Sequence, residues 1–158
     1  GNYQYPGVKQ AHQNRLKALS HPQWIDAMTL LIGHYTDPAD PYFRIHDSGD
    51  LQSVEHLLQW VQVAKNLPHI DFWMPTKEHK MYKDGKTIMG PTWPKNLVVR
   101  LSAPMIGKEP PASFGDLPTS TVQAESGFEC EAYKRGNKCG PCRACWEPDV
   151  QNVDYHVQ

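Results

Sequence analysis

The sequence predicts an α/β protein, built on a partial barrel or an open, mostly parallel sheet with flanking helices and a C-terminal cysteine-rich cluster loop. Short segments rich in branched and aromatic residues alternate with helical patterns, as in α/β folds. All four cysteines of the 158-residue chain lie between positions 130 and 145. This length fits one domain over residues 1–158, with residues 130–146 as the metal-cluster loop.

The first forty residues favour two helices. Residues 8–19 place apolar side chains at helical spacing among polar ones. Ser20 is expected to cap a second helix, which tolerates Pro22 in its first turn. That helix carries one broad apolar stripe, formed by Trp24, Ile25, Met28, Leu31, Ile32 and Tyr35.

A strand, a helix and a second strand follow. Residues 42–45 form a short apolar strand, which runs into a polar loop at residues 46–50. The helix that follows ends before Pro68 and is expected to be capped by Asp50 or Ser53. Residues 70–74 form the next strand, and a helical crossover makes the two strands parallel.

The second half of the chain is expected to contain more loop. Residues 81–95 are predicted to be a loop because glycine and proline turn signals gather in them. Residues 96–102 form a third strand, rich enough in branched residues to be buried on both faces. Residues 119–123 form a short fourth strand, and the tail at residues 150–158 is extended.

Polar side chains gather where these strands end. In parallel sheets, ligands bind at the carboxyl ends of the strands because the loops there leave the core together. His46, Asp47, Lys77 and Arg100 are therefore the candidate catalytic residues. Arg100 lies inside an apolar strand, where a charge must be paired or face a cavity. Asp50 is better explained as a helix cap than as a catalytic acid.

The cysteine spacing favours an iron–sulfur cluster. Cys139, Cys142 and Cys145 repeat in Cys-x-x-Cys steps, and Cys130 lies upstream. Three closely spaced thiolates can bind three corners of a 4Fe–4S cluster while the fourth ligand comes from further away. Zinc is the alternative, although structural zinc is usually held by two separated pairs of ligands. Disulfides or free thiols are the third alternative.

Basic residues in the same loop have two explanations. Lys134, Arg135, Lys138 and Arg143 could stabilise an anionic cluster. They could instead belong to a zinc-organised module that presents them to nucleic acid or to a host protein. Trp146 directly follows the last cysteine and is expected to shield the metal from water.

Composition narrows the classes of partner. The formal net charge of −1 gives no global basic field, so nucleic acid is not favoured. No apolar segment is long enough to span a membrane. Cysteines grouped for metal binding indicate a reducing, cytoplasmic compartment. A redox partner or a small-molecule substrate is the expected kind of partner.

Three motifs resemble a known family. F-R-I-H-D-S-G-D-L-Q-S-V-E-H, L-P-T-S-T-V and G-N-K-C-G-P-C-R-A-C-W, with G-N-Y at the start, are similar to the bacteriophage "gene product 88" family. The likeness covers about residues 1–155, and longer members carry a further cysteine-containing segment before the G-N-Y position. The resemblance implies a phage origin and a location in the host cytoplasm.

The same family is distantly similar in organisation to radical-SAM barrels, in which three cysteines hold a 4Fe–4S cluster and leave one iron open. That class spaces its cysteines Cys-x-x-x-Cys-x-x-Cys near the first strand, whereas this chain has its triple near the end. Whether Cys130 is the fourth ligand then distinguishes a closed cluster from one with an open iron. The prediction is a 4Fe–4S protein with a redox or radical-type function, and the alternative is the zinc-stabilised binding module.

Overall fold

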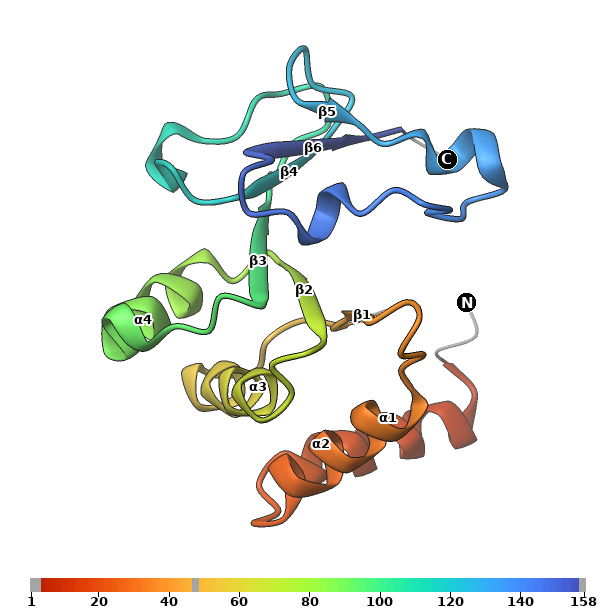
Figure 1. The fold of residues 1–158 in the computed structure, drawn as a ribbon, viewed down its shortest axis with the longest axis vertical. Coiled ribbons are helices and arrows are strands. Elements are labelled where there is room, and N and C mark those ends of the chain that lie inside the picture. The colour runs from red at the N-terminus through yellow and green to blue at the C-terminus, as the bar shows by residue number, and fades with distance from the viewer. Residues whose placement is uncertain (1–3, 47–48, 157–158) are drawn as a thin grey trace.

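A computed structural model describes residues 4–46 and 49–156, and its centre is a six-stranded sheet (Figure 1). Every strand pairs in parallel with its neighbours. The order across the sheet is β1-β2-β3-β4-β6-β5. The strands are β1 (Tyr42–Arg44), β2 (Asp71–Thr76), β3 (Leu97–Ser102), β4 (Thr119–Val122), β5 (Phe128–Glu129) and β6 (Asn152–Tyr155).

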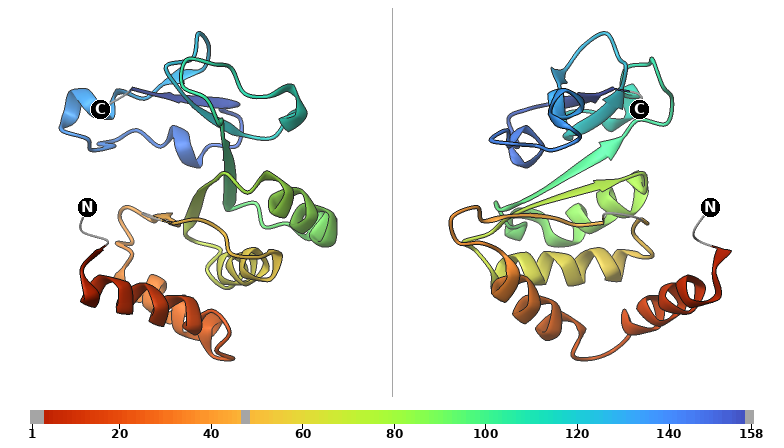
Figure 2. Two further views of the ribbon diagram at one scale, coloured as in Figure 1. Left: turned by 180° about the vertical axis from the view of Figure 1, so that it is seen from behind. Right: turned by 90° about the vertical axis from the view of Figure 1, so that its right-hand side faces the viewer.

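The sheet is open and curls into a half-barrel, which confirms the predicted fold class (Figure 2). Successive side chains on a strand point to opposite faces. On β2, Phe72 and Met74 enter the main hydrophobic core, whereas Trp73 between them packs in a second cluster with Ala144, Cys145 and Val153. The cysteine loop therefore lies on the face of the sheet opposite to the main core.

The helices are α1 (Pro6–Ala18), α2 (Trp24–Tyr35), α3 (Val54–Asn66) and α4 (His79–Met89). α3 and α4 cover the outer face of the sheet, α2 packs on α3, and α1 lies further out with no buried residue (Figure 2). α3 contacts both α2 and α4, and Leu57 and Val61 of α3 are buried in the core. Among the described residues, none of these helices combines the length and the apolar character that a membrane span needs.

The helix α4 corrects one prediction, because residues 81–95 were expected to be a loop. Gly85 lies in the middle of this helix, where sequence reasoning takes glycine for a turn signal. A Cβ atom at Gly85 would lie 2.6 Å from Cδ2 of Leu57. Glycine here permits close contact between α4 and α3, so its role is packing rather than chain reversal.

Helix capping follows one prediction and contradicts another. Ser53 caps α3, because its hydroxyl accepts a hydrogen bond from the backbone N–H of His56 at 3.1 Å. Ser20 does not cap α2, whose N-cap residue is Gln23. The Ser20 hydroxyl instead donates to the carbonyl of Lys17, at the end of α1.

These two serines form a matched pair for measurement. Ser53→Ala should lower the free energy of unfolding by about 1 kcal/mol, because a helix N–H loses its acceptor. Ser20→Ala should change it by less than about 0.5 kcal/mol, since its surroundings are exposed. Chemical denaturation monitored by circular dichroism measures both. Equal losses in the two variants would contradict the assignment of the cap.

The cysteine loop and the cavity beside it

The four cysteines are free thiols at different depths in one region of the protein. Cys145 is 7% exposed and belongs to the cluster around Trp73 and Val153. Cys130 and Cys142 are half-buried and pack against the same cluster, whereas Cys139 is exposed. Three sulfur-bearing side chains therefore share one apolar environment at the concave face of the half-barrel.

The sulfur atoms do not enclose a common centre. Among the residues that the structure describes, no three His, Cys, Asp or Glu side chains are grouped closely enough to hold a metal ion. Residues 136–141, which include Cys139, are all exposed. Gly136, Asn137 and Gly140 have positive φ angles, so this segment turns sharply beside the buried part of the loop.

Arg100 holds the end of the cysteine loop against the sheet. It lies on β3 and is 0% exposed. Its Nε atom donates to the carbonyl of Cys145 at 2.9 Å, and Nη2 donates to Ala144 at 2.8 Å and Glu147 at 2.6 Å. Nη1 donates to the carbonyl of Val150 at 2.7 Å and, more weakly, to that of Thr119 at 3.3 Å.

The guanidinium of Arg100 is a buried charge that lacks a carboxylate partner. None of the carboxylates in the described parts of the chain forms an ion pair with it. Burial lowers its pKa, and the neighbouring Cys145 and Tyr155 act in the opposite direction. Since arginine stays protonated in proteins, a full positive charge lies under the cysteine loop, and among the described residues its hydrogen-bond partners are main-chain carbonyls.

Tyr155 joins β6 to the same group of side chains. Its hydroxyl oxygen lies 3.2 Å from Sγ of Cys145. Burial raises the pKa of Cys145 to about 11 and also raises the pKa of Tyr155. Both groups are therefore neutral at pH 7 in the chain without metal.

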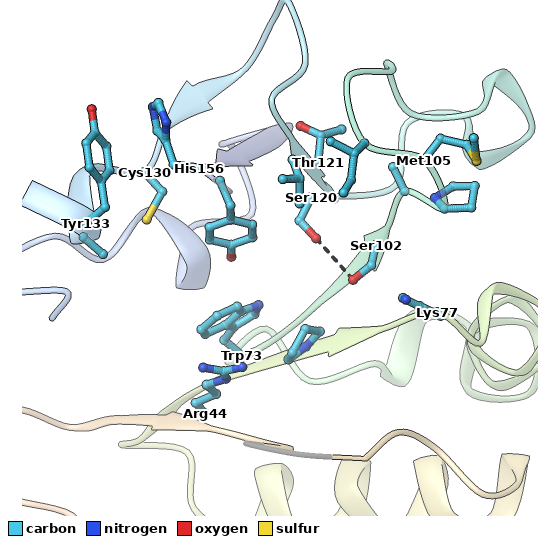
Figure 3. A pocket seen from close by; sticks show the side chains of 17 residues that line it. Arg44, Trp73, Lys77, Ser102, Met105, Ser120, Thr121, Cys130, Tyr133 and His156 are labelled. Atoms are coloured by element: carbon cyan, nitrogen blue, oxygen red, sulfur yellow. Dashed lines mark hydrogen bonds between the residues drawn. The ribbon is translucent and has the colours of Figure 1, made fainter. Parts of the chain in front are cut away.

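A cavity of about 620 Å³ opens beside this group, at the carboxyl ends of the strands (Figure 3). β1 contributes Arg44, β2 contributes Trp73, and Lys77 directly follows β2. Hydroxyl groups come from the central strands, where Ser120 of β4 donates to Ser102 of β3 at 3.4 Å. The far wall is formed by Cys130, Ala132, Tyr133, Tyr155 and His156.

A second cavity, of about 700 Å³, lies between α1, α2 and α3. His46 lines it, and neither ring nitrogen of His46 has a hydrogen-bond partner among the described residues. His56 packs against His46 and accepts a hydrogen bond from Nε1 of Trp60 at 2.9 Å. Burial lowers the pKa of His56 to about 4, so this side chain is uncharged at neutral pH.

The structure separates the four catalytic candidates. Lys77 lines the cavity beside the cysteine loop, and His46 lines the other one. Arg100 is enclosed, with its donors occupied by main-chain carbonyls. Asp47 lies outside the described residues. Among the candidates that the structure describes, Lys77 is therefore the residue whose accessible side chain lies beside the cysteines.

The structure corrects the prediction that Asp50 caps a helix. Its carboxylate accepts hydrogen bonds from the hydroxyl of Thr76, from the backbone N–H of Lys77 at 2.8 Å and from that of Leu51 at 2.7 Å. It therefore ties the loop after β1 to the end of β2. This contact fixes the backbone of Lys77 at the edge of the first cavity.

The basic residues of the loop are largely engaged with carboxylates. Lys134 and Arg135 both pair with Glu131, at 2.9 and 3.5 Å, and Arg143 pairs with Asp40. Trp146 packs its ring against Trp73, with the centroids 5.2 Å apart. No compact unpaired basic surface of the kind that nucleic acid binds is formed by these described side chains.

Sequence reasoning missed several residues that line the first cavity, among them Arg44, Trp73 and Tyr155. Arg44 carried the same signal as Arg100, a charge inside an apolar strand. Trp73 carried none, because an aromatic residue in a strand usually belongs to the core. Tyr155 lies in a tail that was expected to be extended, and its strand pairing depends on distant residues.

These features define an open, all-parallel α/β half-barrel with a thiol-rich loop at its concave face. The model of the family "Gene product 88" matches residues 1–113, so the chain belongs to that bacteriophage family. The match includes α1 to α4 and β1 to β3, and it ends before the cysteine loop. Neither the curated proteins nor the solved structures contain a match to the chain.

Removing the Arg100 side chain should release the cysteine loop. Arg100→Met should lower the free energy of unfolding by about 3 kcal/mol, because several buried carbonyls lose a charged donor. Arg44→Met is the control, since Arg44 is exposed and makes no ion pair among the described residues. Chemical denaturation gives the energies. Similar small losses in both variants would show that the hydrogen bonds of Arg100 add little.

Proposed function

We propose that Cys130, Cys139, Cys142 and Cys145 hold one 4Fe–4S cluster, and that the protein is a phage iron–sulfur protein that works in the host cytoplasm. The single observation that supports this most is the buried guanidinium of Arg100, which has no carboxylate partner among the described residues. A 4Fe–4S cluster with four thiolates carries a net charge of about −2 in its oxidised state. That charge would compensate the buried arginine.

The surroundings of the cysteines also fit such a cluster. All four donors are sulfur, which iron–sulfur clusters prefer. Trp73, Trp146 and Tyr155 cover the buried side of the loop and would limit the access of water. The exposed segment at residues 136–141 carries Cys139, so this cysteine can approach the others without opening the core.

The chain's own residues would tune the cluster. Cluster potentials depend on net charge, on hydrogen bonds to sulfur and on exposure. Arg100 supplies positive charge, and the Tyr155 hydroxyl lies at hydrogen-bond distance from Sγ of Cys145. Such a cluster transfers single electrons when bound. This suits a redox protein or a radical-type enzyme, and the ligand role of Cys130 separates the closed form from the open one.

Metal analysis under anaerobic conditions tests the proposal. The purified protein should be brown, should absorb broadly near about 400 nm and should contain about four iron and four sulfide per chain. Cys139→Ser, Cys142→Ser and Cys145→Ser should each lose most of the iron. Tyr133→Phe, which alters an exposed ring in the same loop, should keep it.

The loss of a cluster ligand must be distinguished from the loss of the fold and from the binding of a different metal. Circular dichroism should show the α/β signal in each serine variant, because the main core lies on the other face of the sheet. If Cys130→Ala retains the cluster, Cys130 is not a ligand and one iron is open. A colourless protein with one zinc per chain would refute the iron–sulfur proposal and support the zinc module.

A further inference from the structure

The cavity beside the cysteine loop has the character of a binding site for an anion. Arg44 and Lys77 line it, and neither forms an ion pair with a carboxylate in the described parts of the chain. No Asp or Glu is among its lining residues. Two cations facing a cavity without a counter-charge favour a negatively charged occupant.

Nearby carboxylates already have partners. Asp154 accepts hydrogen bonds from the hydroxyl of Thr121 at 2.7 Å and from the backbone N–H of Ala124 at 2.9 Å. Glu129 accepts from the hydroxyl of Tyr133 and lies 3.1 Å from His156. These carboxylates hold the far side of the cavity together, and within the described ranges none of them forms an ion pair with Arg44 or Lys77.

Donors also converge on this cavity. Trp73 is 5% exposed, and its Nε1 atom is a buried donor without an acceptor among the described residues. Figure 3 shows its indole beside Arg44, whose guanidinium carbon lies 4.9 Å from the ring centroid. The hydroxyls of Ser102 and Ser120 lie above them. A buried donor of this kind is rare unless a ligand or a water molecule accepts its hydrogen bond.

The rest of the lining is apolar. Pro104, Met105 and Ile106 follow β3 and line the cavity, and Figure 3 shows Met105 at the opposite end from Tyr133. Met105 and Ile106 are 62% and 64% exposed, so they present apolar surface that an occupant would cover. A volume of about 620 Å³ is in the range of small-molecule sites.

We propose that this cavity binds a small organic molecule with an apolar body and one oxyanion group, either a carboxylate or a phosphate. Lys77 binds the oxyanion, Ser102 and Ser120 hydrogen-bond to it, and Met105 and Ile106 cover the apolar part. Arg44 adds positive charge from the other end of the cavity, where it lies beside Trp73. Cys130 and Tyr155 border the same cavity, so the molecule lies next to the cysteine loop. Binding needs no cluster, and the two proposals therefore fail separately.

Calorimetric titration of the full chain tests the inference, with phenyl phosphate and benzoate as probes and benzyl alcohol as the uncharged probe of matched shape. Saturable binding of at least one anion is expected, together with no binding of the alcohol at the same concentrations. The stronger of the two anions assigns the oxyanion as phosphate or carboxylate.

Substitutions locate the site. Lys77→Met should weaken the binding of that anion by about tenfold or more, the scale expected for one lost charge-assisted hydrogen bond. Arg44→Met should weaken it by a smaller factor, because Arg44 contributes positive charge from the other end of the cavity. Lys80→Met is the matched control, because Lys80 is an exposed lysine on α4 outside the cavity, and it should leave the affinity unchanged. Circular dichroism and iron content should be the same in all three variants.

Two results would overturn the inference. One is the absence of saturable binding for both anions. The other is binding that Lys77→Met and Arg44→Met leave unchanged, or that Lys80→Met weakens equally. Iron content is measured on the same samples, so loss of the cluster is distinguished from loss of the anion.

Discussion

The arrangement of the functional region depends on one buried arginine. Arg100 points from β3 to the concave face of the sheet, and most of its donors bind carbonyls between Ala144 and Val150. This segment leads into β6, so the same contact positions Cys145 and the strand that carries Tyr155. A loop with little regular structure is thereby fixed to a rigid sheet, at the electrostatic cost of a charge without a carboxylate.

The parallel sheet explains why the cavity lies where it does. Parallel strands end at one edge, and the loops that leave this edge cannot pack as tightly as the core. Helices fill the outer face around Leu57 and Met74. The inner face is filled only in part, by Trp73 and the cysteine loop, and the space that remains lies between Arg44, Lys77 and Tyr155.

Local patterns predicted much of this fold. The strand–helix–strand unit from β1 to β2 follows from a short apolar run, a capping Ser53 and a stop at Pro68. α4 was missed because Gly85 serves contact with Leu57, which only the packed structure reveals. β5 was missed, and β6 was expected only as an extended tail, because pairing between distant segments leaves no local signal.

The site was predicted less completely than the fold. The cysteine spacing indicated the loop, and a charge within an apolar strand singled out Arg100. The partners of Arg100 are carbonyls, which every residue has, so no sequence pattern could identify them. The cavity is lined by Arg44 and Trp73, which are paired neighbours on β1 and β2, and by Tyr155 of β6, which the curl of the sheet brings toward them.

We propose that the positive charge of Arg100 faces a negatively charged inorganic centre held by the four sulfurs. Anomalous diffraction at the iron absorption edge, from crystals grown without oxygen, tests it directly. One compact iron peak is expected on the concave face, surrounded by Sγ of Cys130, Cys139, Cys142 and Cys145 and close to Arg100. The absence of an iron peak there, or a peak elsewhere in the molecule, would contradict it.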